Sequence, residues 1–96
     1  MSTKIKQLQL PHIFFKEGKK IIAYTPALDL STFGNTLAQA QKRFGEIVEI
    51  FFEELVKMGT LEEVLLECGW ERHHNEFLPP TVISQGLTTV SVPLPN

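Results

Sequence analysis

Apolar residues between Thr36 and Met58 recur at intervals of three and four residues, with one adjacent pair. This spacing places them on one face of an α-helix. The members of the face are Leu37, Ala40, Phe44, Ile47, Val48, Phe51, Leu55 and Met58. Ile50 and Phe52 lie beside the face and widen it, which indicates a second contact with a later segment or with another subunit. The pattern therefore predicts one long helix around which the rest of the chain is organised.

Short polar motifs predict where this helix and the next one begin. The Thr36 hydroxyl can accept a hydrogen bond from the backbone N–H of Gln39, and the Gln39 side chain can reach back to the N–H of Thr36. Gly59 can adopt the left-handed conformation that often ends a helix. The motif repeats at Thr60 and Glu63, which predicts a second, shorter helix. Its apolar stripe consists of Leu61, Val64, Leu65 and Cys68. Gly69 is expected to end this helix, and Trp70 to anchor its exit against the core.

Residues before the long helix alternate between apolar and polar positions in three short runs. Residues 4–16 predict a first strand, in which an interrupted alternation and Pro11 indicate an edge position or a bulge near residues 6–11. A polar turn leads to a second strand at residues 20–25, so the two strands form a β-hairpin. Residues 28–33 predict a short third strand.

The C-terminal residues differ in character from the helical region. Pro79 and Pro80 form a stiff, extended linker. Beyond them, a segment rich in threonine and valine alternates as a strand with one apolar face would. Such a segment can add to the hairpin of its own chain or to the sheet edge of a second chain, and the sequence leaves both open. The tail residues assigned to contact between chains are Val82, Ile83, Val90 and Val92.

Three strands, two helices and a strand-like tail predict an α+β fold. We expect an antiparallel sheet of three to four strands, in the order β-β-β-α-α-β, packed on one long helix. Residues 1–78 would form the domain and residues 79–96 the extended tail.

The composition is that of an ordinary globular domain. The chain has 96 residues, of which 43% are hydrophobic, and its mean hydropathy is near zero. No apolar run approaches the ~20 residues that a membrane span requires, and the N-terminus alternates rather than forming a secretory leader. The single cysteine, Cys68, has no partner for an internal disulfide and fits a small core residue. We therefore expect a cytoplasmic protein that does not enter the membrane.

The net charge of −2 conceals an uneven distribution of charge along the chain. Residues 1–20 carry five lysines against one glutamate, whereas residues 42–76 carry four basic residues against nine glutamates. One interpretation is that the acidic helical region is simply a solvated surface. The other is that it meets a basic partner, since charge complementarity guides association.

The segment from the second strand into the long helix, IIAYTPALDLSTFGNTLAQAQKRFGEIVEIFFEEL, resembles the HicB-like antitoxin family of type II toxin–antitoxin systems. In that family a β-hairpin leads to a Pro-x-Leu step, a short third strand, a glycine and a Thr-x-x-Glu-Ala helix start. The residues at these positions here are Pro26, Leu28, Gly34, Thr36 and Ala40. Gln39 replaces the usual glutamate, and the segment Asp29-Leu30-Ser31 replaces the common Pro-Gly-Cys. The match covers roughly residues 10–70.

The resemblance implies a degenerate ribonuclease-H-like, or partial ferredoxin-like, unit without nuclease activity. It implies that this unit binds and masks a small RNA-cleaving toxin, which we expect to be basic. The surface expected to meet the toxin is the acidic outer face of the helices, together with an exposed strand edge. The acidic residues assigned to it are Glu46, Glu49, Glu53, Glu62 and Glu63.

The resemblance leaves two points open. Many members of the family carry a C-terminal DNA-binding part, but this chain shows no helical pattern after Leu78, so direct DNA binding is not expected. The alternative is an orphan HicB-like domain that works without a toxin, in a structural or small-ligand-binding role. In both cases we expect a homo-oligomer that is at least a dimer.

No catalytic or metal-binding motif stands out in the sequence. A ribonuclease H mechanism needs several carboxylates around metal ions, whereas the predicted strands offer only Asp29. The pair His73 and His74 would need further ligands, for which Cys68, Glu71, Glu76 and His12 are conceivable. A polar exit segment after the second helix is the simpler interpretation. We therefore expect no enzyme activity, no metal and no cofactor.

Overall fold

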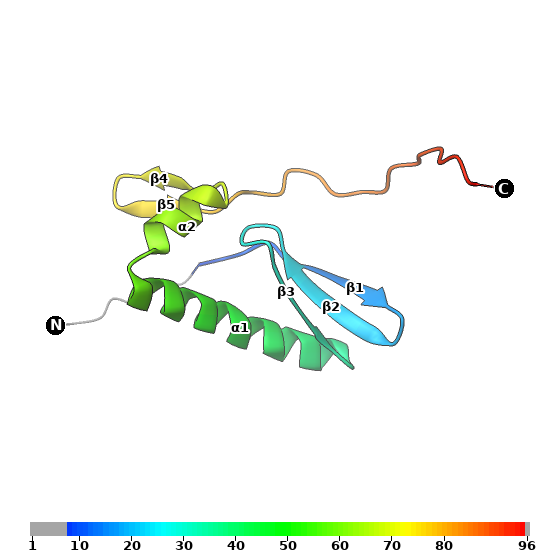
Figure 1. Cartoon of the computed structure of the whole chain (residues 1–96), viewed down its shortest axis with the longest axis horizontal. Helices are drawn as coiled ribbons and strands as arrows, with labels where there is room; N and C mark the ends of the chain where they lie inside the picture. The colour runs from blue at the N-terminus through cyan, green and yellow to red at the C-terminus, as the bar shows by residue number, and fades with distance from the viewer. Residues whose placement is uncertain (1–7, 96) are drawn as a thin grey trace.

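The computed structural model describes residues 8–95 and has an α+β architecture (Figure 1). Strands β1 (Ile13–Glu17), β2 (Lys20–Thr25) and β3 (Leu30–Gly34) form an antiparallel sheet in the order β1-β2-β3. The long helix α1 (Leu37–Met58) lies along one face of this sheet and is followed by the short helix α2 (Leu61–Glu67). The last elements, β4 (Glu71–His73) and β5 (Glu76–Leu78), pair as a separate hairpin. The predicted α+β class, with a three-stranded antiparallel sheet beside one long helix, is confirmed.

The core of the described residues consists of two clusters, one on the middle of the sheet and one at the β2–β3 loop. Ala23 of β2 packs against Ala40 and Phe44 of α1. The second cluster joins the β2–β3 loop to α2 and includes Ala27, Leu28, Leu65 and Trp70. Trp70 is buried, and its indole N–H donates to the Ala27 carbonyl oxygen at 2.7 Å. The expectation that Trp70 anchors the exit from the second helix is therefore confirmed.

The ends of α1 largely follow the predicted signals. The Thr36 hydroxyl accepts from the Gln39 N–H at 3.1 Å, as expected. The Gln39 side chain instead accepts from the N–H of Asn35 at 2.7 Å, one residue before the predicted donor. Gly59 ends the helix with a φ of 69°, a left-handed conformation that glycine adopts at little cost.

The predicted capping box at the start of α2 is wrong. Thr60 makes no side-chain hydrogen bond to the helix, and its hydroxyl oxygen is buried without a partner. Its ψ of 9° differs from the extended conformation that an N-cap residue usually adopts. In this backbone conformation the Thr60 hydroxyl makes no hydrogen bond to the N–H groups of the first turn of α2.

The close approach of β3 to α1 depends on glycine at position 34. A Cβ atom on Gly34 would lie 2.6 Å from the backbone nitrogen of Ala40. Any side chain there would push the end of the strand away from the first turn of the helix. Gly34 therefore sets the distance between the sheet and the helix at this point.

Three further expectations need correction. The first strand begins at Ile13 rather than near residue 4; residues 8–12 are not in a strand, and residues 4–7 lie outside the described part of the chain. The segment taken as a polar exit forms the β4–β5 hairpin, with His74 at a φ of 56° in its turn. The tail from residue 79 to residue 95 has no regular strand and extends away from the body (Figure 1). The strand predicted in the tail therefore has no partner within this chain's described residues.

Candidate protein-binding surfaces

The outward side of α1 carries an acidic stripe formed by Glu46, Glu49 and Glu53, with an exposed lysine one turn before it, Lys42, and another one turn after it, Lys57. The three glutamates are exposed and follow one another at intervals of three and four, which places them on one side of the helix. That side is opposite Phe44, which is buried against the sheet. The stripe therefore faces away from the rest of the fold, as the sequence predicts.

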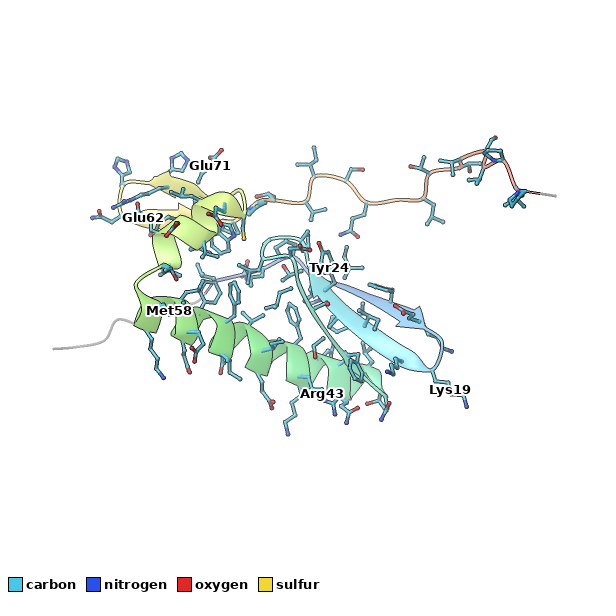
Figure 2. All side chains as sticks on the ribbon, in the orientation of Figure 1. Lys19, Tyr24, Arg43, Met58, Glu62 and Glu71 are labelled. Carbon is cyan, nitrogen blue, oxygen red and sulfur yellow. The ribbon has the colours of Figure 1, made fainter. Side chains whose placement is uncertain are left out.

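The other two predicted glutamates, Glu62 and Glu63, lie on α2 and belong to a different surface. Helix α2 turns back onto the side of α1 that faces the core, where the cluster that contains Leu65 packs against Phe51 and other residues of α1 (Figure 1). Glu62 also forms an ion pair with Arg72 of β4. Figure 2 shows Glu62 at the end of the molecule opposite Lys19 in the β1–β2 turn. The structure therefore brings three of the five glutamates together and separates the other two from them.

A second candidate surface is the face of the sheet that α1 does not cover. Ala23 points toward α1, so the neighbouring residues on β2, Ile22 and Tyr24, point the other way. The strand register places their cross-strand partners beside them on this face. We define the outer sheet patch as Ile13, Phe15, Ile22, Tyr24 and Phe33. Phe15 is 46% exposed and Phe33 is 43% exposed, although both are large apolar side chains.

Sequence reasoning did not identify the outer sheet patch. The two-residue period of a strand at residues 20–25 places Ile22 and Tyr24 on one face, so the sequence carries a usable signal for part of the patch. The sequence pattern could not show which face of the sheet α1 covers, because both faces carry apolar residues.

The two edges of the sheet differ in how they are protected. At the β3 edge, the Arg43 guanidinium donates to the Phe33 carbonyl oxygen at 2.9 Å. The Lys20 ammonium lies 4.3 Å from the centroid of the Phe33 ring, a cation–π contact. No strand within residues 8–95 pairs with the outer edge of β1. The β1 edge is therefore open to strand addition.

The tail consists of two parts, a base at residues 79–82 and an exposed arm at residues 83–95. Its base runs through Pro79 and Pro80, and the Pro80 ring lies 3.7 Å from where a Gly69 Cβ would be. Beyond this point the apolar side chains are uncovered: Ile83 is 96% exposed, Leu87 is fully exposed, and the other exposed apolar residues are Val90, Val92 and Leu94. The predicted contact residues Ile83, Val90 and Val92 therefore lie on the arm, whereas Val82 lies at its base.

Asp29 has a structural contact rather than a metal-binding environment. The Tyr24 hydroxyl donates to its carboxylate at 3.0 Å. This hydrogen bond, with partial loss of solvent and the negative charge of Asp29, raises the pKa of Tyr24 above its ordinary value of 10.0. Asp29 itself has a φ of 50°, in the left-handed region. The hydrogen bond therefore links β2 to a loop residue with an unusual backbone conformation.

The other candidate chemical groups do not assemble into a site. Burial, followed by the charges of Glu67 and Asp29, raises the pKa of the Cys68 thiol, which makes it a poor nucleophile. The His73 imidazole lies 3.1 Å from the Glu71 carboxylate. Within the described part of the chain, no three histidine, cysteine, aspartate or glutamate residues gather as metal ligands would.

No family model matches the chain, and no curated protein or solved structure matches it. The resemblance to HicB-like antitoxins therefore rests on the order and spacing of residues in the hairpin, the loop and the long helix. None of the helices in residues 8–95 has the length and apolar character needed to cross a membrane.

Proposed function

We propose that this protein is a non-catalytic, cytoplasmic binding protein of the HicB-like type, which binds and neutralises a small, basic RNA-cleaving toxin. The observation that carries the proposal is the acidic stripe of α1. Glu46, Glu49 and Glu53 face outward on the side of the helix away from the core. A rigid helix that presents three carboxylates within two turns favours a basic protein partner, because complementary charge raises the rate of encounter. The resemblance supplies the class of that partner.

The stripe is tested by reversing its charge. We expect Glu49→Lys combined with Glu53→Lys to slow association with the basic protein encoded next to this chain by roughly tenfold at low salt. The association rate is measured by surface plasmon resonance, with salt dependence as a second readout. The matched control is Glu54→Lys with Glu67→Lys, which makes the same charge change at exposed positions outside the stripe. Equal rates for the two double variants would exclude the stripe as the binding surface.

The second candidate function is an orphan homo-oligomer with a structural or ligand-binding role. The exposed apolar arm of the tail and the outer sheet patch favour this alternative, because a lone chain leaves both surfaces in water. The two functions differ in one observable. The antitoxin requires a neighbouring gene whose small basic product arrests growth when it is expressed alone and does not when this chain is expressed with it. Normal growth with the neighbouring product alone would favour the orphan oligomer.

A further inference from the structure

We propose that the tail of one copy adds as a parallel edge strand to β1 of a second copy, where Val90, Val92 and Leu94 cover the exposed side of Ile13 and Phe15. The inference deepens the self-association expected above and is independent of the toxin. It assigns an occupant to the open β1 edge and to part of the outer sheet patch.

The exposure of the tail provides the first argument. Its arm carries five apolar side chains, all of them exposed, and apolar side chains of this size gain stability when they are buried. An unpaired extended segment cannot remain a stable strand in water. The arm therefore needs a surface that offers both backbone hydrogen bonds and apolar side chains.

The prolines determine which side of the tail can pair. In a strand, the backbone N–H groups of residues two apart point to the same side. Pro93 and Pro95 lack this group, so the side that they share cannot pair along its length and must face solvent. The opposite side carries the backbone groups of Val90, Val92 and Leu94. The tail therefore fits the outermost strand of a sheet, in which the backbone groups of its apolar residues form the hydrogen bonds and the edge that contains the prolines faces solvent.

The open edge of β1 provides the second argument. Gly18 and Lys19 form a two-residue turn closed by the Glu17–Lys20 pair, so backbone groups of Phe15 face β2 and those of Phe14 and Lys16 face the open edge. The hydrogen bond from Arg43 to the Phe33 carbonyl agrees with this alternation, because it shows that the backbone groups of Phe33 point away from β2. Those of its partner Ile22 therefore point away from β3 and toward Phe15 of β1. The β1 edge therefore offers backbone groups at alternate residues, as the tail does.

These two alternations together determine the direction of the added strand. In antiparallel pairing, hydrogen-bonded residues lie directly opposite each other, so Val92 would share a face with Phe14 or Lys16. In parallel pairing, the residue opposite Val92 is one whose backbone groups point away from the added strand and toward β2. In β1 these residues are Ile13 and Phe15, so Val92 would share a face with one of them. This second face is the exposed apolar one. The parallel direction therefore buries the apolar side of the tail on the outer sheet patch.

The position of the arm favours a second copy over the chain's own sheet. Figure 1 shows the red end of the tail, from about residue 90, beyond the β1–β2 hairpin along the long axis of the molecule. The chain extends 63 Å along this axis and at most 29 Å across it. The part of the tail that alternates most regularly thus lies past the end of its own β1. The stiff Pro79–Pro80 step at the base holds this direction.

Cross-linking between differently tagged chains tests the arrangement. In a Cys68→Ser background, a chain with Val92→Cys is mixed with a chain carrying Phe15→Cys, and the mixture is mildly oxidised. We expect a disulfide between the two tagged chains. The matched partner, Lys16→Cys, lies on the other face and is expected to cross-link poorly. A disulfide formed within a doubly substituted Val92→Cys, Phe15→Cys chain of monomeric mass, or preferential linkage to Lys16→Cys, would overturn the proposal.

A second measurement keeps the test independent of the engineered cysteines. We expect light scattering to show that the native chain is at least dimeric. We also expect Val92→Asp to raise the dissociation constant by at least about tenfold. The control Ser91→Asp, on the other side of the strand, is expected to change it less than about twofold. A monomeric native chain, or equal effects of the two variants, would overturn self-association through the tail and leave the toxin proposal unaffected.

Discussion

At the scale of single residues, the contact between Tyr24 and Asp29 joins the end of β2 to the β2–β3 loop with a hydrogen bond of 3.0 Å. Asp29 has a left-handed conformation, which aspartate and asparagine tolerate better than most residues. Asp29, the one carboxylate that the predicted strands offered, is part of the scaffold of this loop.

The titration of Tyr24 tests this interpretation directly. Because the neutral phenol donates to a carboxylate, ionisation is disfavoured, and the pKa of Tyr24 lies above 10.0. We expect Asp29→Ala to lower the pKa toward the ordinary value, since it removes both the hydrogen bond and the negative charge. The chain has one tyrosine, so the ultraviolet absorbance of its phenolate reports this residue alone. The same pKa in both proteins would show that Asp29 has no influence on the phenol.

At the scale of elements, the packing of β3 against α1 depends on the absence of a Cβ atom at Gly34. We expect Gly34→Ala to lower the free energy of unfolding by about 1–3 kcal/mol, because the new Cβ would collide with backbone atoms of Ala40. Gly45→Ala is the control: no heavy atom lies within 4 Å of a Cβ there. In the middle of a helix this change should raise stability by roughly 0.5–1 kcal/mol. Urea unfolding at one fixed protein concentration, followed by Trp70 fluorescence, measures both.

The opposite signs of these two changes make the comparison decisive. If Gly34→Ala were as stable as the native chain, the packing of β3 against the first turn of α1 would not require a glycine at position 34.

The long helix could be predicted because its information is local. The apolar spacing, the Thr36 cap and Gly59 lie within the element that they define. The β4–β5 hairpin could not be predicted, since its stability comes from contacts across the fold. Arg72 pairs with Glu62 of α2, and Phe77 packs against the core cluster that contains Trp70, while the hairpin itself has no apolar alternation.

The same distinction applies to the candidate surfaces. The helical period was enough to place Glu46, Glu49 and Glu53 together. It could not show that Glu62 lies on another side of the molecule, because this depends on the turn at Gly59 and on how α2 packs against the core. The outer sheet patch was hidden for a related reason, since only the position of α1 determines which sheet face is left uncovered.

At the scale of the whole molecule, the two candidate surfaces lie on opposite sides of a two-layer fold. The acidic stripe faces outward from α1, and the outer sheet patch faces outward from the sheet (Figure 1). A partner on the stripe and a second copy on the sheet would therefore not compete for space. We therefore expect the proposed binding of a basic protein to be disrupted at Glu49 and Glu53, and the proposed self-association to be disrupted separately at Val92.

The most direct test of the proposed function is affinity capture from the native organism with the tagged full-length chain, followed by mass spectrometry of the eluate. We expect a small basic protein in stoichiometric amount with the native chain and with Val92→Asp, and much less of it with the Glu49→Lys, Glu53→Lys variant. An eluate that contains this chain alone, from protein shown by circular dichroism to be folded, would contradict the proposed function.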